Sequence, residues 1–256
     1  MAERGALRIA VLVKQVSDMN AIRVDRARGT IVPSPQLVMS SYDQYAVEAA
    51  LRLKEALGGE VIAVTAGPAS ARDVVTRALT MGADRGIHLE LPDVNAADTL
   101  GIARLLAEAL APLGCDLVIA GQTSDDLETG QVGAQVAALL DVPVISNVVE
   151  VSIDGRELTA RRDMEDGFQT VRTSLPALLL SSTGLDEPRV PSLKGIMAAK
   201  KKPIEAVPAS VEGERRLEWS EPTVPEKTVS GTIVQDAPPA EAARQLVAWL
   251  QEQKLI

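Results

Sequence analysis

The sequence is poor in the side chains that most catalytic and metal sites use. It has one Cys, one His, one Phe, two Tyr and two Trp in 256 residues. A single cysteine cannot form a disulfide within the chain, so we expect a reducing, cytoplasmic setting. A zinc site needs three or four Cys, His or carboxylate ligands, and Cys115 and His88 alone cannot supply a standard one. We therefore expect no metal site, a structural role for His88 and a packing role for Cys115.

Other absences exclude further classes of protein. No G-x-S-x-G motif accompanies His88, so a serine hydrolase triad is not expected. A net charge of -9 and the shortage of aromatic rings argue against nucleic-acid binding. No apolar run approaches the roughly 18 residues of a membrane span, and the N-terminus does not read as a signal peptide. If the chain takes part in difficult chemistry, a bound cofactor is expected to carry it, and we expect no catalytic residue.

Short apolar runs alternate with helical patterns through the first ~180 residues, as buried parallel strands and their connecting helices do. We expect one helix from about Ser41, which is a candidate N-cap, and another that ends near Leu110 and is capped by Asp98 or Asn95. The predicted fold is therefore α/β, with a mostly parallel, doubly wound sheet. The predicted strands are residues 7–13, 60–66, 86–91 and 116–120, and further helices are expected after Pro68 and Glu128.

The pattern changes after about residue 148. Four extended pieces follow, at residues 148–153, 157–162, 169–172 and 177–181, with a hairpin turn at 154–155. Residues 203–240 show little periodicity and indicate an extended arm, which ends in a helix with an apolar face. We divide the chain into residues 1–184, 185–202 and 203–256. The apolar face of the final helix is formed by Ala243, Leu246, Val247 and Leu250.

Three loops follow the carboxyl ends of predicted strands, where open parallel sheets bind ligands. They are residues 14–18, 65–70 and 121–134. The third contains glycines, hydroxyls and carboxylates and runs into a helix start, a place that favours an anion. One interpretation is a nucleotide phosphate at Thr129–Val132, and the other is an ordinary capped loop, because neither a P-loop nor a G-x-G-x-x-G motif is present.

A proline-bounded segment at residues 188–202 carries Leu193, Ile196 and Met197 at helical spacing, followed by the basic run Lys200–Lys202. An exposed apolar trio beside a basic patch is typical of a partner-docking surface. The same spacing is also typical of core packing, which the spacing alone slightly favours.

Several segments together resemble the beta subunits of electron-transfer flavoproteins, over roughly residues 7–205. The most diagnostic are Leu-Pro-Ala-Leu at 175–178, Asp-Glu-Pro-Arg-Val-Pro-Ser-Leu at 186–193 and Met-Ala-Ala-Lys-Lys-Lys at 197–202. Similar stretches also lie at residues 11–14, 46–54, 61–68 and 78–88.

The resemblance implies a fold like that of flavodoxin or the adenine-nucleotide alpha hydrolases, and a non-enzymatic electron carrier. Residues 1–184 would be a nucleotide-binding domain that pairs with an alpha subunit, which holds most of an FAD. This chain would bind a second nucleotide through Leu12 and Ala66 at the adenine, and through Asp126, Thr129, Gly130, Gln131 and Val132 at the phosphates. Tyr42 and Arg162 would face the flavin of the alpha subunit.

The resemblance also implies partners. Residues 185–202 would be a recognition loop in which Leu193, with Ile196 and Met197, docks onto acyl-CoA or other flavin dehydrogenases. Residues 203–256 would wrap the alpha subunit. Electrons would pass on to a quinone oxidoreductase or a ferredoxin-like acceptor.

The identity of the second nucleotide stays open. Loop 126–133 is closer to that of electron-bifurcating relatives, which hold a second FAD, whereas Gly86-Ile-His88 looks like the ordinary members, which hold AMP. We keep two further alternatives, an AMP-binding regulatory α/β domain and a purely structural subunit.

Overall fold

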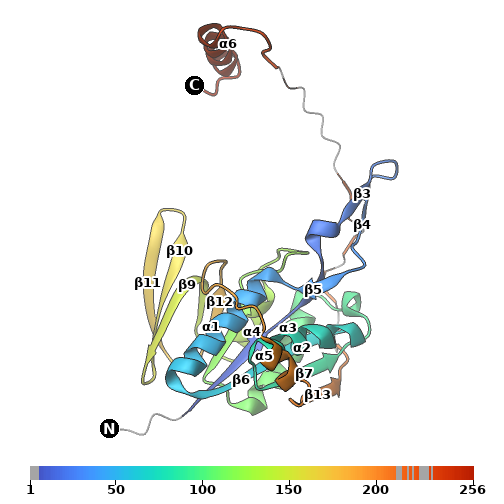
Figure 1. The fold of residues 1–256 in the computed structure, drawn as a ribbon, viewed down its shortest axis with the longest axis vertical. Helices are drawn as coiled ribbons and strands as arrows, with labels where there is room; N and C mark the ends of the chain where they lie inside the picture. The colour runs from blue at the N-terminus through green and yellow to red at the C-terminus, as the bar shows by residue number, and fades with distance from the viewer. Residues whose placement is uncertain (1–5, 212–214, 218, 221, 225–230, 232) are drawn as a thin grey trace.

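The computed structural model describes residues 6–211, 215–217, 219–220, 222–224, 231 and 233–256. One nine-stranded sheet forms its centre, in the order β11-β10-β9-β12-β8-β1-β6-β7-β13 (Figure 1). Strands β9, β12, β8, β1, β6, β7 and β13 run parallel, and β10 and β11 extend β9 as an antiparallel meander. The predicted α/β class with a mostly parallel sheet is confirmed.

All strands of the large sheet except β13 overlap the predicted runs. The strands of this sheet are β1 (Leu7–Leu12), β6 (Gly59–Gly67), β7 (Arg85–Glu90), β8 (Leu117–Gly121), β9 (Val144–Asp154), β10 (Glu157–Met164), β11 (Gly167–Ser174), β12 (Ala177–Ser181) and β13 (Ile204–Pro208). Two small sheets pair β2 (Gln15–Ser17) with β5 (Leu37–Met39) and β3 (Arg23–Asp25) with β4 (Thr30–Val32).

Helices cover both faces of the large sheet, which makes it doubly wound. Alternate β1 residues divide between the two sides: Ile9 and Val11 pack beneath α1 (Ser41–Leu57) and α2 (Arg72–Met81). Ala10 and Leu12 pack beneath α3 (Thr99–Leu110) and α4 (Val132–Leu139). Burial on both faces explains why the strand is a continuous apolar run.

Two helices lie outside these layers. Helix α5 (Leu193–Ala199) packs on α2, and α6 (Pro239–Glu252) stands apart from the sheet at the end of the chain (Figure 1). Short 3-10 turns occur at Met19–Ala21, Ala69–Ala71, Val94–Ala96 and Ala111–Leu113. Among the described residues, no helix has the length and apolar character needed to cross a membrane.

Two sequence expectations differ from the structure. The expected N-cap Ser41 is the first residue of α1, and the N-cap is Ser40, because the Ser41 hydroxyl and amide both donate to Asp125 from another loop. The segment after residue 203 begins with a strand, β13, which pairs with β7 at the edge of the sheet. Pro208 is compatible with this position because an edge strand leaves one row of backbone groups unpaired.

Expectations about three single residues agree with the structure. Asp98, and not Asn95, is the N-cap of α3, with its Oδ1 accepting from the Gly101 N–H at 2.8 Å. His88 is buried in β7, with Nε2 3.0 Å from the Gly67 carbonyl oxygen, as a structural imidazole would be. Cys115 is a half-buried free thiol just before β8, and burial raises its pKa to about 11, so it is unreactive at neutral pH.

Candidate functional site

A cavity of about 470 Å³ lies where the order of the strands in the sheet reverses. Strands β6 and β7 follow β1 on one side, whereas β8 returns to its other side, so the crevice between β1 and β8 is a topological switch point. All three loops singled out in the sequence contribute to the cavity lining. So do all seven residues expected at a nucleotide: Leu12, Ala66, Asp126, Thr129, Gly130, Gln131 and Val132.

The loop after β8 is attached to the loop after β1. The Lys14 ammonium donates to Asp126 Oδ1 at 2.7 Å and to Ser124 Oγ at 3.1 Å, and Ser124 Oγ donates to the same carboxylate oxygen at 2.7 Å. This cluster sets the position of the 124–126 segment. The lysine stays partly exposed, so its positive charge also lies at the cavity wall.

Side-chain hydrogen bonds also join the other loops that line the cavity to one another. Gln15 and Ser70 join the loops after β1 and β6 through two hydrogen bonds of 2.7 Å each. The Thr99 hydroxyl, at the start of α3, donates to Gln131 Oε1 at 2.8 Å. The cavity therefore has a preformed frame built from short side-chain bridges.

Asp43 is a buried carboxylate at the floor of this cavity, and sequence reasoning missed it. Its Oδ2 accepts from the Lys14 N–H at 2.7 Å and its Oδ1 from the Gly121 N–H at 3.2 Å, so it joins the ends of β1 and β8. Burial raises its pKa to about 7, although these two backbone donors lower it. Gly121 is required beside it, because a Cβ there would lie 2.5 Å from Asp43 Oδ1.

Two features of the cavity wall indicate a polar ligand. The Thr123 hydroxyl is buried and has no hydrogen-bond partner in the described structure. Helix α4 begins at the cavity with Gln131 as N-cap, and no side chain caps its first N–H groups. Uncapped N–H groups and a free hydroxyl can donate hydrogen bonds to the oxygens of a phosphate or a ribose.

Tyr42 and Arg162 do not line this cavity. Arg162 lines a second hollow of about 830 Å³ between the start of β9 and the β10–β11 hairpin, together with Asn147, Phe168 and Ser182. Its Nη2 donates to Ser146 Oγ at 2.8 Å, while its Nε is buried without a partner in the described structure. Tyr42 is near this side, since its carbonyl accepts from Ser181 Oγ at 3.1 Å.

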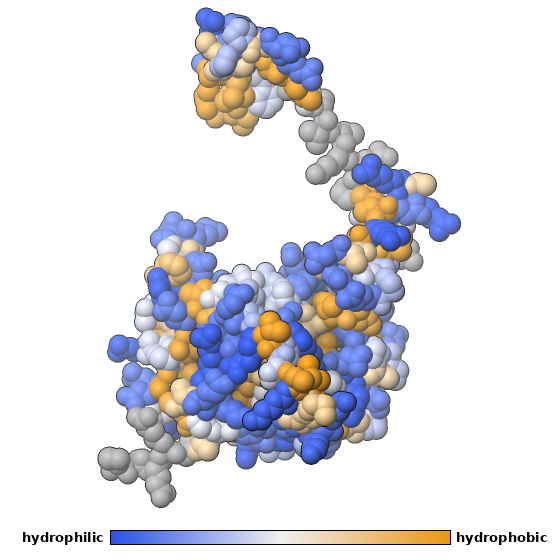
Figure 2. Space-filling model, in the orientation of Figure 1, coloured by the Kyte–Doolittle hydropathy of each residue, from blue (hydrophilic) through white to orange (hydrophobic). Residues whose placement is uncertain are grey.

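The apolar trio of the 185–202 segment is exposed. Leu193 is 77% exposed, Met197 56% and Ile196 41%, and all three lie on α5. Figure 2 shows apolar surface over the place that α5 occupies in Figure 1. Core packing, which the spacing alone slightly favoured, is therefore wrong for this trio. We call residues 185–202 the docking segment, after the role that the resemblance implies for them.

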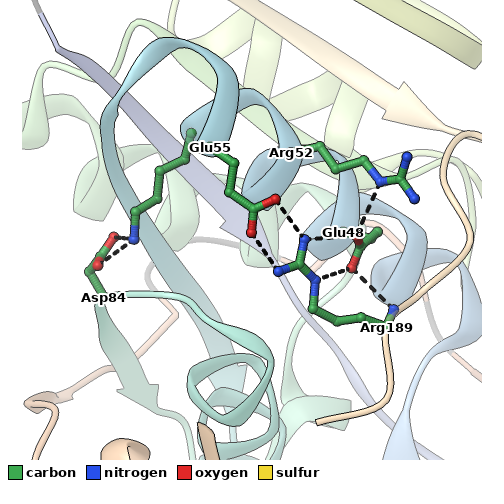
Figure 3. Close-up of polar contacts among 6 residues, drawn as sticks. Glu48, Arg52, Glu55, Asp84 and Arg189 are labelled. Atoms are coloured by element: carbon green, nitrogen blue, oxygen red, sulfur yellow. Dashed lines mark hydrogen bonds and ion pairs between the residues drawn. The ribbon is translucent and has the colours of Figure 1, made fainter. Parts of the chain in front are cut away.

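Arg189 attaches the docking segment to α1 (Figure 3). Its Nε and backbone N–H donate to Glu48 Oε2 at 2.8 and 3.1 Å, its Nη2 donates to Glu48 Oε1 at 2.9 Å, and its Nη1 donates to Glu55 at 2.6 Å. Burial alone would raise the pKa of Glu48, but the Arg189 and Arg52 donors outweigh it and hold the pKa below its usual range. Glu48 is therefore a buried, fully paired carboxylate.

Two further contacts fix the docking segment on α2. Gly195 packs so closely that a Cβ there would lie 2.6 Å from the Thr80 carbonyl oxygen. The Lys202 ammonium donates to the carbonyls of Leu79 and Ala83 at the end of α2, where a cation is favoured. Lys200 and Lys201 remain exposed beside the apolar trio.

Among the described residues, no group of three or more His, Cys, Asp or Glu side chains could hold a metal ion. The candidate site consists of the cavity between β1 and β8, the second hollow beside the β10–β11 hairpin and the separate exposed segment 185–202.

Comparison with known proteins assigns the family. The family model described as "Electron transfer flavoprotein domain" matches residues 29–212. The chain is 36% identical over 247 residues to an electron transfer flavoprotein subunit beta of Syntrophomonas wolfei, with 96% of each chain covered. It is 37% identical over 254 residues to the subunit of that name in Sus scrofa, covering 96% of this chain and 97% of the relative. It is also 35% identical over 223 residues to that of Bacillus subtilis, covering 84% and 86%. The chain therefore belongs to the electron transfer flavoprotein family, in which it is similar to the beta subunits.

Proposed function

We propose that this chain is the beta subunit of a heterodimeric electron carrier whose FAD is held mainly by an alpha subunit, with AMP in the cavity between β1 and β8. The observation that carries the proposal is the convergence of the seven expected nucleotide residues on one cavity at the switch point. Family membership supports the electron-transfer role. No side chain of this chain acts as acid, base or nucleophile in such a role.

The donor set of the cavity fits a nucleotide. The Thr123 hydroxyl and the uncapped start of α4 would bind phosphate or ribose oxygens, and Leu12 and Ala66 would line the adenine. A volume of about 470 Å³ lies within the range of ligand pockets and is large enough for AMP. The alternative is a second FAD in an electron-bifurcating subunit, which the sequence of loop 126–133 favours.

Tyr42 and Arg162 would form the wall that this chain presents to the flavin of the alpha subunit. When bound there, FAD supplies the redox chemistry. The guanidinium of Arg162 would place a positive charge at that wall. The β10–β11 hairpin would help to keep water from this side.

The docking segment would recognise the electron donor. Leu193 stands on a short helix that Arg189, Gly195 and Lys202 hold in place, so it offers a preformed apolar anchor. We expect the electron donor to be an acyl-CoA dehydrogenase or another flavin dehydrogenase. The electron acceptor would be a quinone oxidoreductase or a ferredoxin-like protein. We expect the complex to lie in the cytoplasm.

The first test is the nucleotide content of the complex. Co-expressed with its alpha subunit, the chain should purify as a yellow heterodimer. Denaturation should release FAD and AMP, which mass spectrometry identifies. Two FAD per heterodimer and no AMP would favour the bifurcating alternative. A colourless complex that cannot be reconstituted with FAD would refute the electron-carrier role.

The second test is Leu193→Ala, measured by flavin reduction with a donor dehydrogenase. We expect a rise in KM for the complex of at least about tenfold, which corresponds to about 1.4 kcal/mol of lost anchor binding, with flavin content unchanged. Leu139→Ala is the matched control, because Leu139 is a 45% exposed leucine on α4, on the other face of the sheet. Equal donor kinetics in wild type and Leu193→Ala would remove the docking role.

A further inference from the structure

The chain segment after β13 runs along the rim of the β1–β8 cavity. Ala209 still follows the sheet edge, with its N–H donating to the Glu90 carbonyl at 2.9 Å. Val211 then lies against Gly101 in the first turn of α3, where a Cβ on the glycine would meet the Val211 side chain at 2.8 Å. The arm is thereby brought to the start of α3, whose Asp98 and Thr99 line the cavity.

Asp98 fixes the arm at this rim. Its Oδ1 caps α3 at Gly101, and its Oδ2 accepts from the backbone N–H of Arg216 at 2.9 Å. The side chain is buried, and the Gly101 and Arg216 donors hold its pKa below its usual range, so it stays ionised at neutral pH. The Arg215 guanidinium adds a 2.8 Å bond to the Asn95 carbonyl.

A second attachment lies a few residues further along, on the β3–β4 hairpin. Val224 donates its N–H to the Gly29 carbonyl at 2.9 Å, and Thr223 forms an antiparallel bridge with Thr30. Figure 1 shows the arm meeting this hairpin beyond β5. The arm is thus held at α3 on one side and at the hairpin on the other.

Trp219 lies between these two attachments and lines the cavity. Among the described lining residues it is the only aromatic one, and it is 40% exposed, so most of its surface is covered. The rest of the lining consists mainly of small, aliphatic and polar side chains. A flat ring at the wall of a cavity that also carries polar groups is a stacking platform for a base.

We infer that Trp219 is a nucleotide-contacting residue, which the arm supplies to one wall of the nucleotide site. The inference rests on the proposed function, since the nucleotide is the ligand that it requires. It extends the binding site to a part of the chain outside the α/β domain. It also links binding to arm position, because a ligand that contacts Trp219 favours the arm conformation seen here.

The shortage of tryptophan makes a direct test possible. The sequence has two, Trp219 and Trp249, so Trp249→Phe leaves Trp219 as the sole indole in the full chain. The purified full chain, freed of co-purified nucleotide, is titrated with AMP and, separately, with FAD. We expect the nucleotide that binds to change the fluorescence emission of Trp219. The Kd from this emission change should equal the Kd that calorimetry gives for the wild-type chain.

Binding by substituted chains provides the second readout. Trp219→Ala should raise the Kd about fivefold or more, which corresponds to the loss of one stacked ring, and Trp219→Phe should restore much of the affinity. Trp249→Ala is the matched control and should bind like the wild type, because Trp249 lies on α6, apart from the cavity.

The outcomes separate this inference from the proposed function. If calorimetry records nucleotide binding but the Trp219 emission stays constant, or Trp219→Ala binds as tightly as the wild type, the inference is wrong and the proposed function stands. If neither AMP nor FAD binds the wild-type chain, the proposed nucleotide site fails and the inference fails with it. The emission test keeps Trp219 in place and changes only Trp249, which lies on α6 apart from the cavity, so it does not depend on whether Trp219→Ala folds.

Discussion

Two buried carboxylates on helix α1, five residues apart, have opposite pKa shifts. Asp43 contacts two backbone N–H groups at the cavity floor, and burial raises its pKa to about 7. Glu48 faces the Arg189 fork, which outweighs the effect of burial and lowers its pKa. The same helix therefore has one carboxylate that gains a proton near neutrality and one that stays ionised.

Asp43→Asn should change how stability depends on pH. Because the folded-state pKa of about 7 exceeds the ordinary 3.8, the folded chain binds the proton more tightly than the unfolded chain between these values. The wild-type free energy of unfolding therefore falls as pH rises from about 4 to 7, and levels off above. Between pH 5 and 8, we expect the wild type to lose about 2–3 kcal/mol relative to Asp43→Asn in urea denaturation.

The exposed Asp73, in the first turn of α2, offers the matched control. Asp73→Asn should give a stability curve parallel to that of the wild type over this range. A parallel curve for Asp43→Asn as well would contradict the raised pKa.

Arg189→Lys tests the docking-segment clamp at the level of one side chain. Lysine keeps the charge but cannot make the two-pronged contacts with Glu48 and Glu55, so we expect a loss of about 1–3 kcal/mol in the free energy of unfolding. Because the Glu48 pKa is lowered from 4.5, this stabilisation is complete above about pH 4.5 and is lost as pH falls through the lower folded-state value. Urea denaturation at pH 7 and pH 3.5 measures both effects.

Arg52→Lys is the control for this clamp, because the Arg52 side chain is 54% exposed and makes only single contacts, one with Glu48 and one with Asp186 of the docking segment. It should cost less than about 1 kcal/mol. If Arg189→Lys were equally mild at pH 7, Arg189 would be an ordinary surface ion pair and not the clamp of the docking segment.

Helix α5 shows at the scale of an element why spacing alone misled. Leu193, Ile196 and Met197 have the spacing of a buried stripe, yet the face that packs on α2 carries Gly195 and Ala199. Two small residues four apart let the helix backbone approach Thr80, and the large apolar residues then point outward. A search for large apolar residues cannot find a packing face made of small ones.

Gly195→Ala should therefore disturb docking although alanine favours the helix. The new methyl group would lie 2.6 Å from the Thr80 carbonyl oxygen, so α5 must shift away from α2 and Leu193 moves with it. We expect KM for the electron donor to rise several-fold and flavin content to stay the same. The rise would come despite a gain of up to about 1 kcal/mol in helix propensity.

Ala198→Gly is the matched control on the same helix, because Ala198 is exposed. It lowers helix propensity by about 1 kcal/mol without a new contact. Should Ala198→Gly weaken donor binding as much as Gly195→Ala, helix stability and not the close approach to α2 would explain the effect.

At the scale of the whole molecule, the sequence predicted those parts of the fold in which buried residues follow a regular pattern. Runs such as residues 7–13 are buried on both faces of the sheet, so their apolar pattern identified the strands and the α/β class. The cavity was predictable as far as its loops follow strands. Asp43 was not, because a helix residue reaches the floor only through the crossing of α1 over β1 and β8. Trp219 and β13 lie in a segment without periodicity, and only tertiary pairing places them.

Helix α6 has an apolar face that the described core does not cover. It stands apart from the sheet in Figure 1, its apolar side is visible in Figure 2, and none of its residues is buried. Leu246 is 55% and Val247 45% exposed, which is costly in water and indicates a face that a partner covers. Under the proposed function, that partner is the alpha subunit.

Leu246→Asp should therefore prevent assembly without changing the stability of the chain alone. A charge in the centre of an apolar interface leaves an unpaired ion buried, so we expect at least a hundredfold weaker association with the alpha subunit, measured by size-exclusion chromatography over a concentration series. Because α6 does not pack on the sheet, the melting temperature of the isolated full chain should stay within about 1–2 °C of the wild type.

Gln245→Asp, on the neighbouring position of the same helix, adds the same charge outside the predicted apolar face and should assemble normally. Normal assembly of Leu246→Asp would mean that the alpha subunit binds elsewhere on the chain, whereas a large fall in melting temperature would mean that α6 packs on its own core.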